Sequence, residues 1–265
     1  MRRVVFNQKG GVGKTSITCN LAAIGAALGY RTLVVDLDVQ GNTTHYLVGE
    51  IDADAFPAEA QGVAGLFKQT VGSRKMRQNP DSFVWETRYE NLYLMPSSPA
   101  LSQMEKELES RYKIYKLRDA LDKLSEEYDR VYIDTPPNFN FYSKSALIAA
   151  DTLLIPFDCD SFARQSLYSL MDNIAELQED HNPDLEVEGV VINQFNSQAR
   201  LPGELVAELK EEGYPVLGTY LNTSVKMKES HREHRPLIDL SPSHKLTAQF
   251  VELHAELEKS LSRAA

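Results

Sequence analysis

The residues from Gln8 to Thr15 have the types and spacing of a loop that binds phosphate groups. Glycines let backbone N–H groups close around phosphate oxygens, and the amino terminus of a following helix adds partial positive charge. Lys14 would supply a point charge to the outer phosphates, and the Thr15 hydroxyl stands where such loops place Mg²⁺. A plain glycine-rich turn with an incidental Lys-Thr pair is the alternative. The residues expected to contact the phosphate-bearing ligand are Lys9, Gly10, Gly11, Val12, Gly13, Lys14, Thr15 and Ser16.

Three aspartates lie at the ends of predicted strands. Asp36 and Asp38 follow the apolar run 32–35, and in an extended chain their side chains project to the same side. Asp134 follows the run 131–133 and precedes two prolines. Transfer of a phosphoryl group to water needs a positioned nucleophile and a held Mg²⁺. Carboxylates at the ligand-binding edge of a sheet suit these tasks, although strand-end carboxylates also cap helices or form turns.

The elements that must position these residues are short apolar runs alternating with helical patterns. Such runs suit strands that are buried on both faces of a parallel sheet. The apolar stripes within 17–28 and 167–177 predict helices, and Gly29 is placed to end the first one. We therefore predict an α/β fold: a single doubly wound, mostly parallel sheet flanked by helices. The expected strands contain residues 4–6, 32–35, 92–94, 131–133, 153–155 and 190–192.

The whole chain, residues 1–265, is predicted to be one domain, because no linker rich in Gly, Ser or Pro divides it. Residues 50–82 have the weakest pattern, and we expect a variable surface excursion there. Residues 101–128 predict one long helix or two, because the apolar spacing slips between positions 112 and 117.

Composition excludes several classes of protein. With 42% hydrophobic and 25% charged residues, the chain is neither disordered nor fibrous. No apolar run approaches the roughly 20 residues of a membrane-spanning helix, and the amino terminus lacks the apolar stretch of a signal peptide. Two cysteines, Cys19 and Cys159, give neither a disulfide framework nor metal-ligand spacing. We therefore expect a cytoplasmic protein. Its net charge of −10 argues against a protein that binds nucleic acid over its whole surface, but it permits a local basic patch.

The loop departs from the commonest phosphate-loop pattern in two ways. Gln8 stands where the first glycine is usual, and Lys9 precedes the paired glycines. The resulting Lys-Gly-Gly-x-Gly-Lys-Thr resembles the deviant Walker A loop of the ParA/MinD class of P-loop ATPases. The segment 36–42, Asp-Leu-Asp-Val-Gln-Gly-Asn, resembles a second motif of that class. The resemblance runs from residue 2 to about residue 258, and it implies that ATP and Mg²⁺ are bound between the two copies of a homodimer.

The resemblance also implies a role for each site residue. Lys9 would reach across to the phosphates held by the partner copy, although a solvated loop lysine is the alternative. Asp38 would position the attacking water, Asp36 would lie near the water shell of the metal, and Asp134 would hold Mg²⁺ through water. Asn193, at the end of the run 190–192, would read the adenine edge with its carboxamide. The expected catalytic residues are Lys9, Lys14 and Asp38, and the expected metal site is Thr15, Asp36 and Asp134.

Within this class, the sequence best resembles ParA-type partition ATPases, whose ATP-bound dimers bind DNA without sequence preference. A ParB-like adaptor stimulates hydrolysis in that branch, and we expect the protein to be associated with the nucleoid. Basic residues in the carboxyl-terminal third of the chain form a cluster that could bind DNA. The alternative for this basic cluster is a solvated helix face that Glu229 and Glu233 neutralise locally. The expected DNA-binding residues are Arg200, Lys226, Lys228, Arg232 and Arg235.

Other branches remain as alternatives. A MinD-like ATPase would position a protein assembly or act at a membrane pole, but the final helix carries Glu252, Glu256 and Glu258, which an anionic membrane repels. We therefore expect no stable membrane association. A kinase or synthetase acting on a small molecule is a further alternative on the same fold, and Lys9 argues against it.

Overall fold

The computed structural model describes residues 1–49, 61–69, 78–160, 163–196, 198 and 200–264. In this part of the chain seven strands form one sheet in the order β3-β4-β2-β5-β1-β6-β7, and every pairing except β3 with β4 is parallel. The prediction of a single, mostly parallel, doubly wound sheet is confirmed. The strands are β1 (Arg2–Val5), β2 (Thr32–Asp36), β3 (Trp85–Glu86), β4 (Leu92–Met95), β5 (Arg130–Asp134), β6 (Thr152–Asp158) and β7 (Glu186–Asn193).

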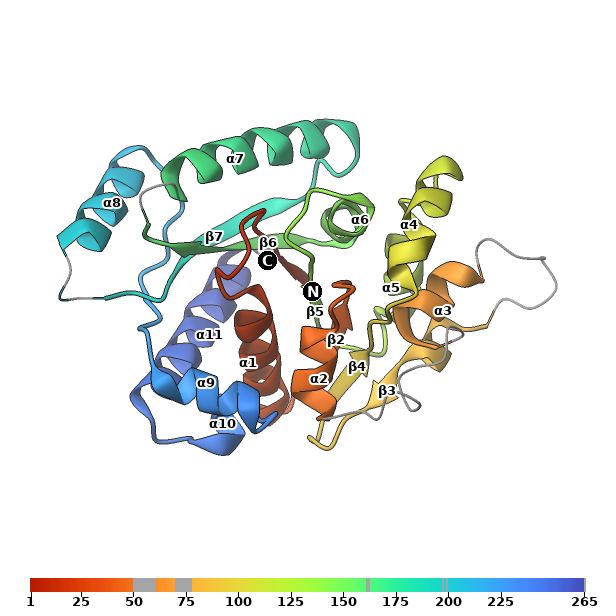
Figure 1. The fold of residues 1–265 in the computed structure, drawn as a ribbon, viewed down its shortest axis with the longest axis horizontal. Helices are drawn as coiled ribbons and strands as arrows, with labels where there is room; N and C mark the ends of the chain where they lie inside the picture. The colour runs from red at the N-terminus through yellow and green to blue at the C-terminus, as the bar shows by residue number, and fades with distance from the viewer. Residues whose placement is uncertain (50–60, 70–77, 161–162, 197, 199, 265) are drawn as a thin grey trace.

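Helices cover both faces of the sheet (Figure 1). On one face lie α1 (Lys14–Ala27), α2 (Asn42–Val48), α9 (Val225–Arg232), α10 (Leu237–Leu240) and α11 (Lys245–Ala264). On the other lie α3 (Gly62–Lys68), η1 (Pro80–Phe83), α4 (Leu101–Ser110), α5 (Lys116–Leu124), α6 (Phe141–Ala149), α7 (Ala163–Asp180) and α8 (Arg200–Glu211).

The alternation of side chains along the strands divides the core into two clusters. In β2, Leu33 and Val35 join the cluster under α5, α6 and α7, while Val34 joins the cluster under α1 and α11. All three are fully buried. Burial on both faces explains why the strands read as continuous apolar runs in the sequence.

Helix α1 ends as the sequence predicts. Leu28 caps it, and Gly29 follows with a φ of 94°, in the left-handed region that glycine adopts without steric cost. The spacing slip predicted within 101–128 is also confirmed, because α4 and α5 are separate helices joined by a turn in which Tyr112 has a φ of 54°.

The excursion predicted at 50–82 is corrected in part. Residues 50–60 and 70–77 lie outside the described part of the chain. Between them, α3 packs Val63 and Phe67 into the core with no exposed surface, so this stretch is not a surface feature. The edge strand β3 has only two residues, too few to produce a sequence pattern.

Candidate functional site

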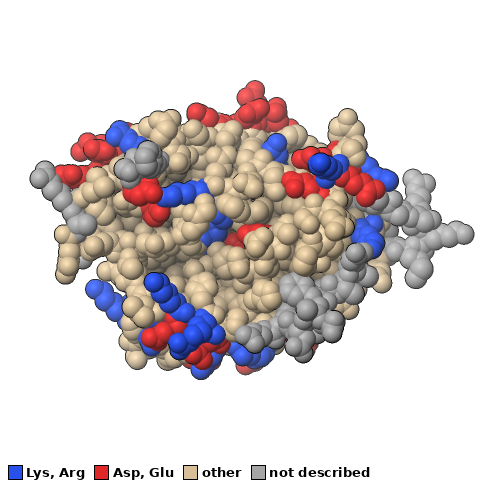
Figure 2. All heavy atoms as spheres, in the orientation of Figure 1, with Lys and Arg blue, Asp and Glu red and all other residues tan. Residues whose placement is uncertain are grey.

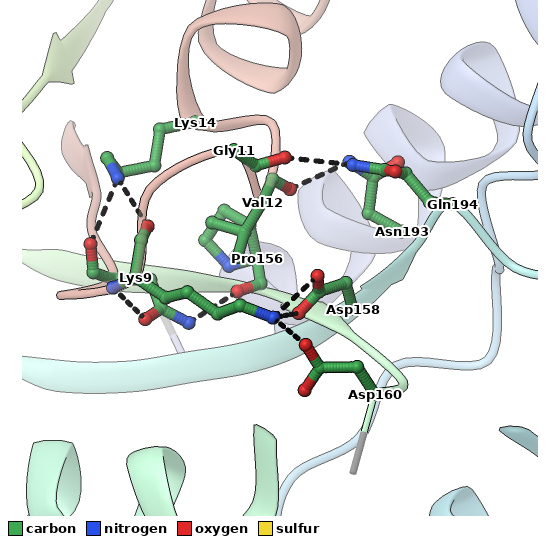
Figure 3. Close-up of polar contacts among 10 residues, drawn as sticks. Lys9, Gly11, Val12, Lys14, Pro156, Asp158, Asp160, Asn193 and Gln194 are labelled. Carbon is green, nitrogen blue, oxygen red and sulfur yellow. Dashed lines mark hydrogen bonds and ion pairs between the residues drawn. The ribbon is translucent and has the colours of Figure 1, made fainter. Parts of the chain in front are cut away.

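The predicted phosphate loop connects β1 to α1 at the carboxyl edge of the sheet. Gly13 immediately precedes α1 with a φ of 94°, and Gly11 has a φ of 78°. A Cβ added to Gly13 would lie 2.2 Å from the side-chain nitrogen of Asn193, so a larger residue does not fit there. Asn193 Nδ2 donates a hydrogen bond of 2.8 Å to the Val12 carbonyl (Figure 3). The end of β7 therefore holds the loop in shape.

Lys14 curls back over the loop (Figure 3). Its Nζ donates to the carbonyl oxygens of Asn7 at 3.0 Å and Lys9 at 2.9 Å, and only 7% of the residue is exposed. Burial lowers the pKa of Lys14, and the charges of Asp134 and Asp38 oppose that shift. The ammonium group is thus held inside the ring of backbone that would surround a phosphate.

Asp36 and Asp134 lie side by side, because they are paired in register at the ends of β2 and β5. Both are fully buried. Asp134 Oδ2 accepts hydrogen bonds of 2.7 Å from the hydroxyls of Thr15 and Thr43. Asp36 Oδ2 accepts from the backbone N–H and hydroxyl of Thr44, at 2.8 and 2.7 Å. The structure thus brings the expected metal-site residues together and adds two threonines that the sequence analysis missed.

The charge of these buried carboxylates is only partly compensated. Burial raises the pKa of Asp36, and the neighbouring charge of Asp134 raises it further. Burial also raises the pKa of Asp134, against the hydrogen bonds from Thr43 and Thr15. Such a site favours an added cation.

The described residues contain no cluster of three His, Cys, Asp or Glu side chains arranged to ligate a metal directly. Mg²⁺ commonly keeps several waters and takes few protein ligands. The residues at this site fit Mg²⁺, which the Thr15 hydroxyl would hold, with Asp36 and Asp134 as the carboxylates that would contact its waters.

Asp38 lies beyond the end of β2 and is half-buried. Its Oδ1 accepts a hydrogen bond of 3.0 Å from the backbone N–H of Gln40, and its carbonyl accepts from Ser97. The backbone N–H of Asp38 also donates a hydrogen bond of 3.1 Å to Asp36 Oδ1, so Asp38 is held beside the buried carboxylates.

Lys9 points away from the loop interior, toward the end of β6 (Figure 3). Its Nζ donates to both carboxylate oxygens of Asp158 at 2.8 Å and also to Asp160. Partial burial lowers the pKa of Lys9, but the hydrogen bonds and charges of the two aspartates outweigh this and raise it. Lys9 is therefore neither free in solvent nor directed at its own loop, and no sequence pattern indicated these two partners.

A cavity of about 400 Å³ adjoins the loop. Its walls combine backbone of the loop with the carboxamide of Asn193 and the apolar side chains of Met227 and Phe250. A flat apolar ring with polar edges matches this lining. Asn193 lines this cavity and its amide nitrogen bonds the loop backbone, and its expected contact with the adenine edge stays a prediction.

Four of the five predicted DNA-binding residues lie on α9 and the turn that follows, but acids accompany them. Arg232 pairs with Glu233 at 3.0 Å, Arg235 with Asp239 at 2.7 Å, and Lys226 with Glu229. Figure 2 shows basic and acidic side chains intermixed over this region. Lys228 is exposed, whereas Arg200 begins α8 and its side chain lies outside the described part of the structure. The local neutralisation weighed in the sequence analysis is present in this single chain.

The chain is similar to known proteins over most of its length. Residues 3–187 match the AAA_31 family, described as an AAA domain. The chain is 32% identical over 260 residues to the chromosome partitioning protein ParA of Myxococcus xanthus, covering 96% of this chain and 87% of that protein. It is 31% identical over 248 residues to the cell division protein PomZ of the same organism, covering 92% and 73%.

Among solved structures, the fold resembles cobyrinic acid a,c-diamide synthase from Mycobacterium smegmatis with a bound ATP analogue and magnesium. The TM-score is 0.83 at 25% identity, and the match covers 100% of this chain and 96% of that one. No helix among the described residues is both long and apolar enough to cross a membrane.

Proposed function

Since the chain belongs to the AAA_31 family and to the ParA/MinD class of ATPases, we propose that it is a nucleotide-switched partition ATPase. In this proposal ATP joins two copies, the dimer binds DNA without sequence preference, and a ParB-like adaptor accelerates hydrolysis. The observation that carries the proposal is the buried Lys14 held over a glycine loop, beside three aspartates and a hydroxyl suited to Mg²⁺.

The residues of this chain divide the work at the phosphates. The loop backbone and Lys14 would bind the β- and γ-phosphates, and the Thr15 hydroxyl would hold Mg²⁺. When bound, Mg²⁺ neutralises negative charge on the phosphate oxygens. Asp38 orients the attacking water, because it is half-buried whereas Asp36 and Asp134 are fully buried.

The proposed dimer gives Lys9 its role. To reach a phosphate on the partner, Lys9 has to leave Asp158 and Asp160 of its own chain. Hydrolysis and release of the γ-phosphate then remove the group that links the two copies, so the dimer separates.

DNA binding would use the cations of α9 and the following turn, with Arg200. Their neutralisation in the single chain makes a lone copy a weak binder, and dimerisation places two such surfaces on one duplex. This predicts DNA binding only with ATP, and association with the nucleoid through that contact.

The test is DNA binding by the purified protein with Mg²⁺–ATP, with ADP or without nucleotide, across a series of salt concentrations. We expect retention only with ATP and a steep loss with salt, because each neutralised phosphate contributes about 0.9 to the slope of log affinity against log salt. Reversing Arg232 and Arg235 to Glu should flatten that slope, whereas reversing the exposed Lys106 and Lys123 should not. Equal retention in all nucleotide states would refute the switch.

Two other candidate functions are favoured by specific similarities. Similarity to the cell division protein PomZ favours a protein assembly as the cargo, and DNA binding without any effect on plasmid or chromosome inheritance would support this.

Similarity to a diamide synthase favours ATP-dependent chemistry on a small molecule. Formation of a new phosphorylated or amidated metabolite, beyond ADP and free phosphate, would support that candidate.

A further inference from the structure

The imidazole of His231, on α9, contacts the first turn of α1. Its Nε2 and the Ser16 hydroxyl oxygen lie 2.8 Å apart and share a hydrogen bond. The ring also stacks on Tyr46 of α2, with centroids 4.8 Å apart and planes 19° from parallel. Ser16 is the second residue after Lys14, so this bond joins a predicted phosphate-contacting residue to the helix that carries the basic cluster.

A second connection runs through Asn20, one turn after Ser16. Its Nδ2 donates 2.8 Å to the Ser16 carbonyl, and its Oδ1 accepts 2.8 Å from the backbone N–H of Leu237 in α10. Asn20 is 1% exposed, so no water competes for these bonds. Hydrogen bonds thus connect the first turns of α1 to both α9 and α10.

A chain of hydroxyls completes the network. Asn20 Nδ2 donates to the Tyr46 hydroxyl at 3.2 Å, Tyr46 bonds Ser230, and Ser230 donates to the carbonyl of Arg235. Ser230 has a single hydroxyl proton and gives it to Arg235, so Tyr46 must be the donor to Ser230. Each of the N–H and O–H protons in this network therefore has one assigned acceptor, which defines one arrangement of Asn20, Tyr46, Ser230 and Arg235.

These polar bonds carry much of the attachment of α9. Ser230 is the one buried residue of this eight-residue helix, and Val225 is 70% exposed. Because α9 buries little apolar surface, its position depends on Ser230, His231 and the partly buried Met227.

A phosphate bound at the start of α1 would change the hydrogen bond between Ser16 and His231. The Ser16 hydroxyl has one proton, which it can donate either to a phosphate oxygen or to Nε2. Once that proton is directed to phosphate, Ser16 can only accept, and His231 has to present a protonated Nε2. Occupation of the loop therefore alters the bond that holds α9.

We infer that His231 is a positioning residue that couples nucleotide in the phosphate loop to the placement of α9. This inference extends the proposed function. It rests on the proposed binding of nucleotide, but not on the proposed binding of DNA. It supplies the route by which ATP would rearrange the cations and acids of α9.

The test compares two replacements of His231 by hydrogen–deuterium exchange of residues 225–232, with and without Mg²⁺ and a non-hydrolysable ATP analogue. His231→Phe keeps an aromatic ring against Tyr46 and removes Nε2, whereas His231→Gln keeps a polar group that can reach Ser16. His181→Phe, at a histidine that bonds Tyr115 instead, is the matched control. Thermal unfolding checks that each variant is folded, and calorimetry measures nucleotide binding.

We expect nucleotide to change exchange in α9 about fivefold in the wild type, in His231→Gln and in the control, since one neutral hydrogen bond contributes about 1 kcal/mol. His231→Phe should lose that response. An unchanged response in folded His231→Phe, or no response in the wild type, overturns the inference. Absence of DNA binding with the exchange response intact refutes only the DNA part of the proposed function. Absence of nucleotide binding refutes both.

Discussion

Replacing Asp158 by Asn should strengthen ATP-dependent dimerisation. In the proposed dimer each Lys9 leaves the carboxylates of its own chain, so any bond that holds Lys9 in the monomer opposes association. The side chain of Lys9 is 28% exposed and that of Asp158 is 23% exposed, which makes this a partly exposed ion pair. Such pairs contribute about 0.2–1 kcal/mol.

The magnitude follows from the two-fold arrangement. Two lysines are released for each dimer formed, so removal of this pair favours the dimer by about 0.4–2 kcal/mol. That corresponds to a dissociation constant lower by a factor of about 2–30. The gain should shrink as salt rises, because ions screen the monomer pair that the substitution removes.

Sedimentation velocity over a range of protein concentrations, with Mg²⁺ and a non-hydrolysable ATP analogue, measures this constant. Asp184→Asn is the matched control, because it removes the same charge at an exposed turn position. If Asp158→Asn dimerises no more tightly than Asp184→Asn, the ion pair does not restrain Lys9 and the reasoning is refuted.

Further predictions concern the loop and its carboxylates. Lys14→Ala should abolish ATP binding in calorimetry, because it removes the one cation held within the loop; retained affinity would contradict its role. Asp38→Ala should keep ATP binding but slow phosphate release by orders of magnitude and prolong the dimer, and normal turnover would rule out its assignment to the water. Burial raises the pKa of Asp36 in the folded protein above its ordinary value of 3.8. The free energy of unfolding without nucleotide should therefore fall as the pH rises above 3.8. Thermal unfolding of Asp36→Asn at pH 5 and pH 8, without Mg²⁺, should show a smaller difference than the wild type, and an equal difference would exclude Asp36 as its source.

The sequence was sufficient for the features that depend on local pattern. Continuous apolar runs identified the long strands, and the ends of those strands placed Asp36 and Asp134 at one edge of the sheet. The left-handed Gly29 and the break between α4 and α5 also follow from spacing over a few residues. In each case the deciding interaction lies within one element or between adjacent elements.

Features that depend on strand order could not be derived in this way. Lys9 meets Asp158 because β1 and β6 are neighbours, although about 150 residues separate the two side chains. The contact of His231 with Ser16 joins even more distant segments, and only the packing of α9 beside α1 creates it. For α3 the pattern was too short and too polar at its borders to indicate burial.

The close approach of Gly13 and Asn193 has a consequence for chemical genetics. Because the loop glycine and the amide interlock, neither position can be altered to widen the adjoining cavity without distorting the loop. An allele that accepts an enlarged purine triphosphate, for selective inhibition or labelling in cells, would instead have to be made at another residue that lines the cavity. Met227 is the better starting point there, because it is only partly buried, whereas Phe250 belongs to the core under α11.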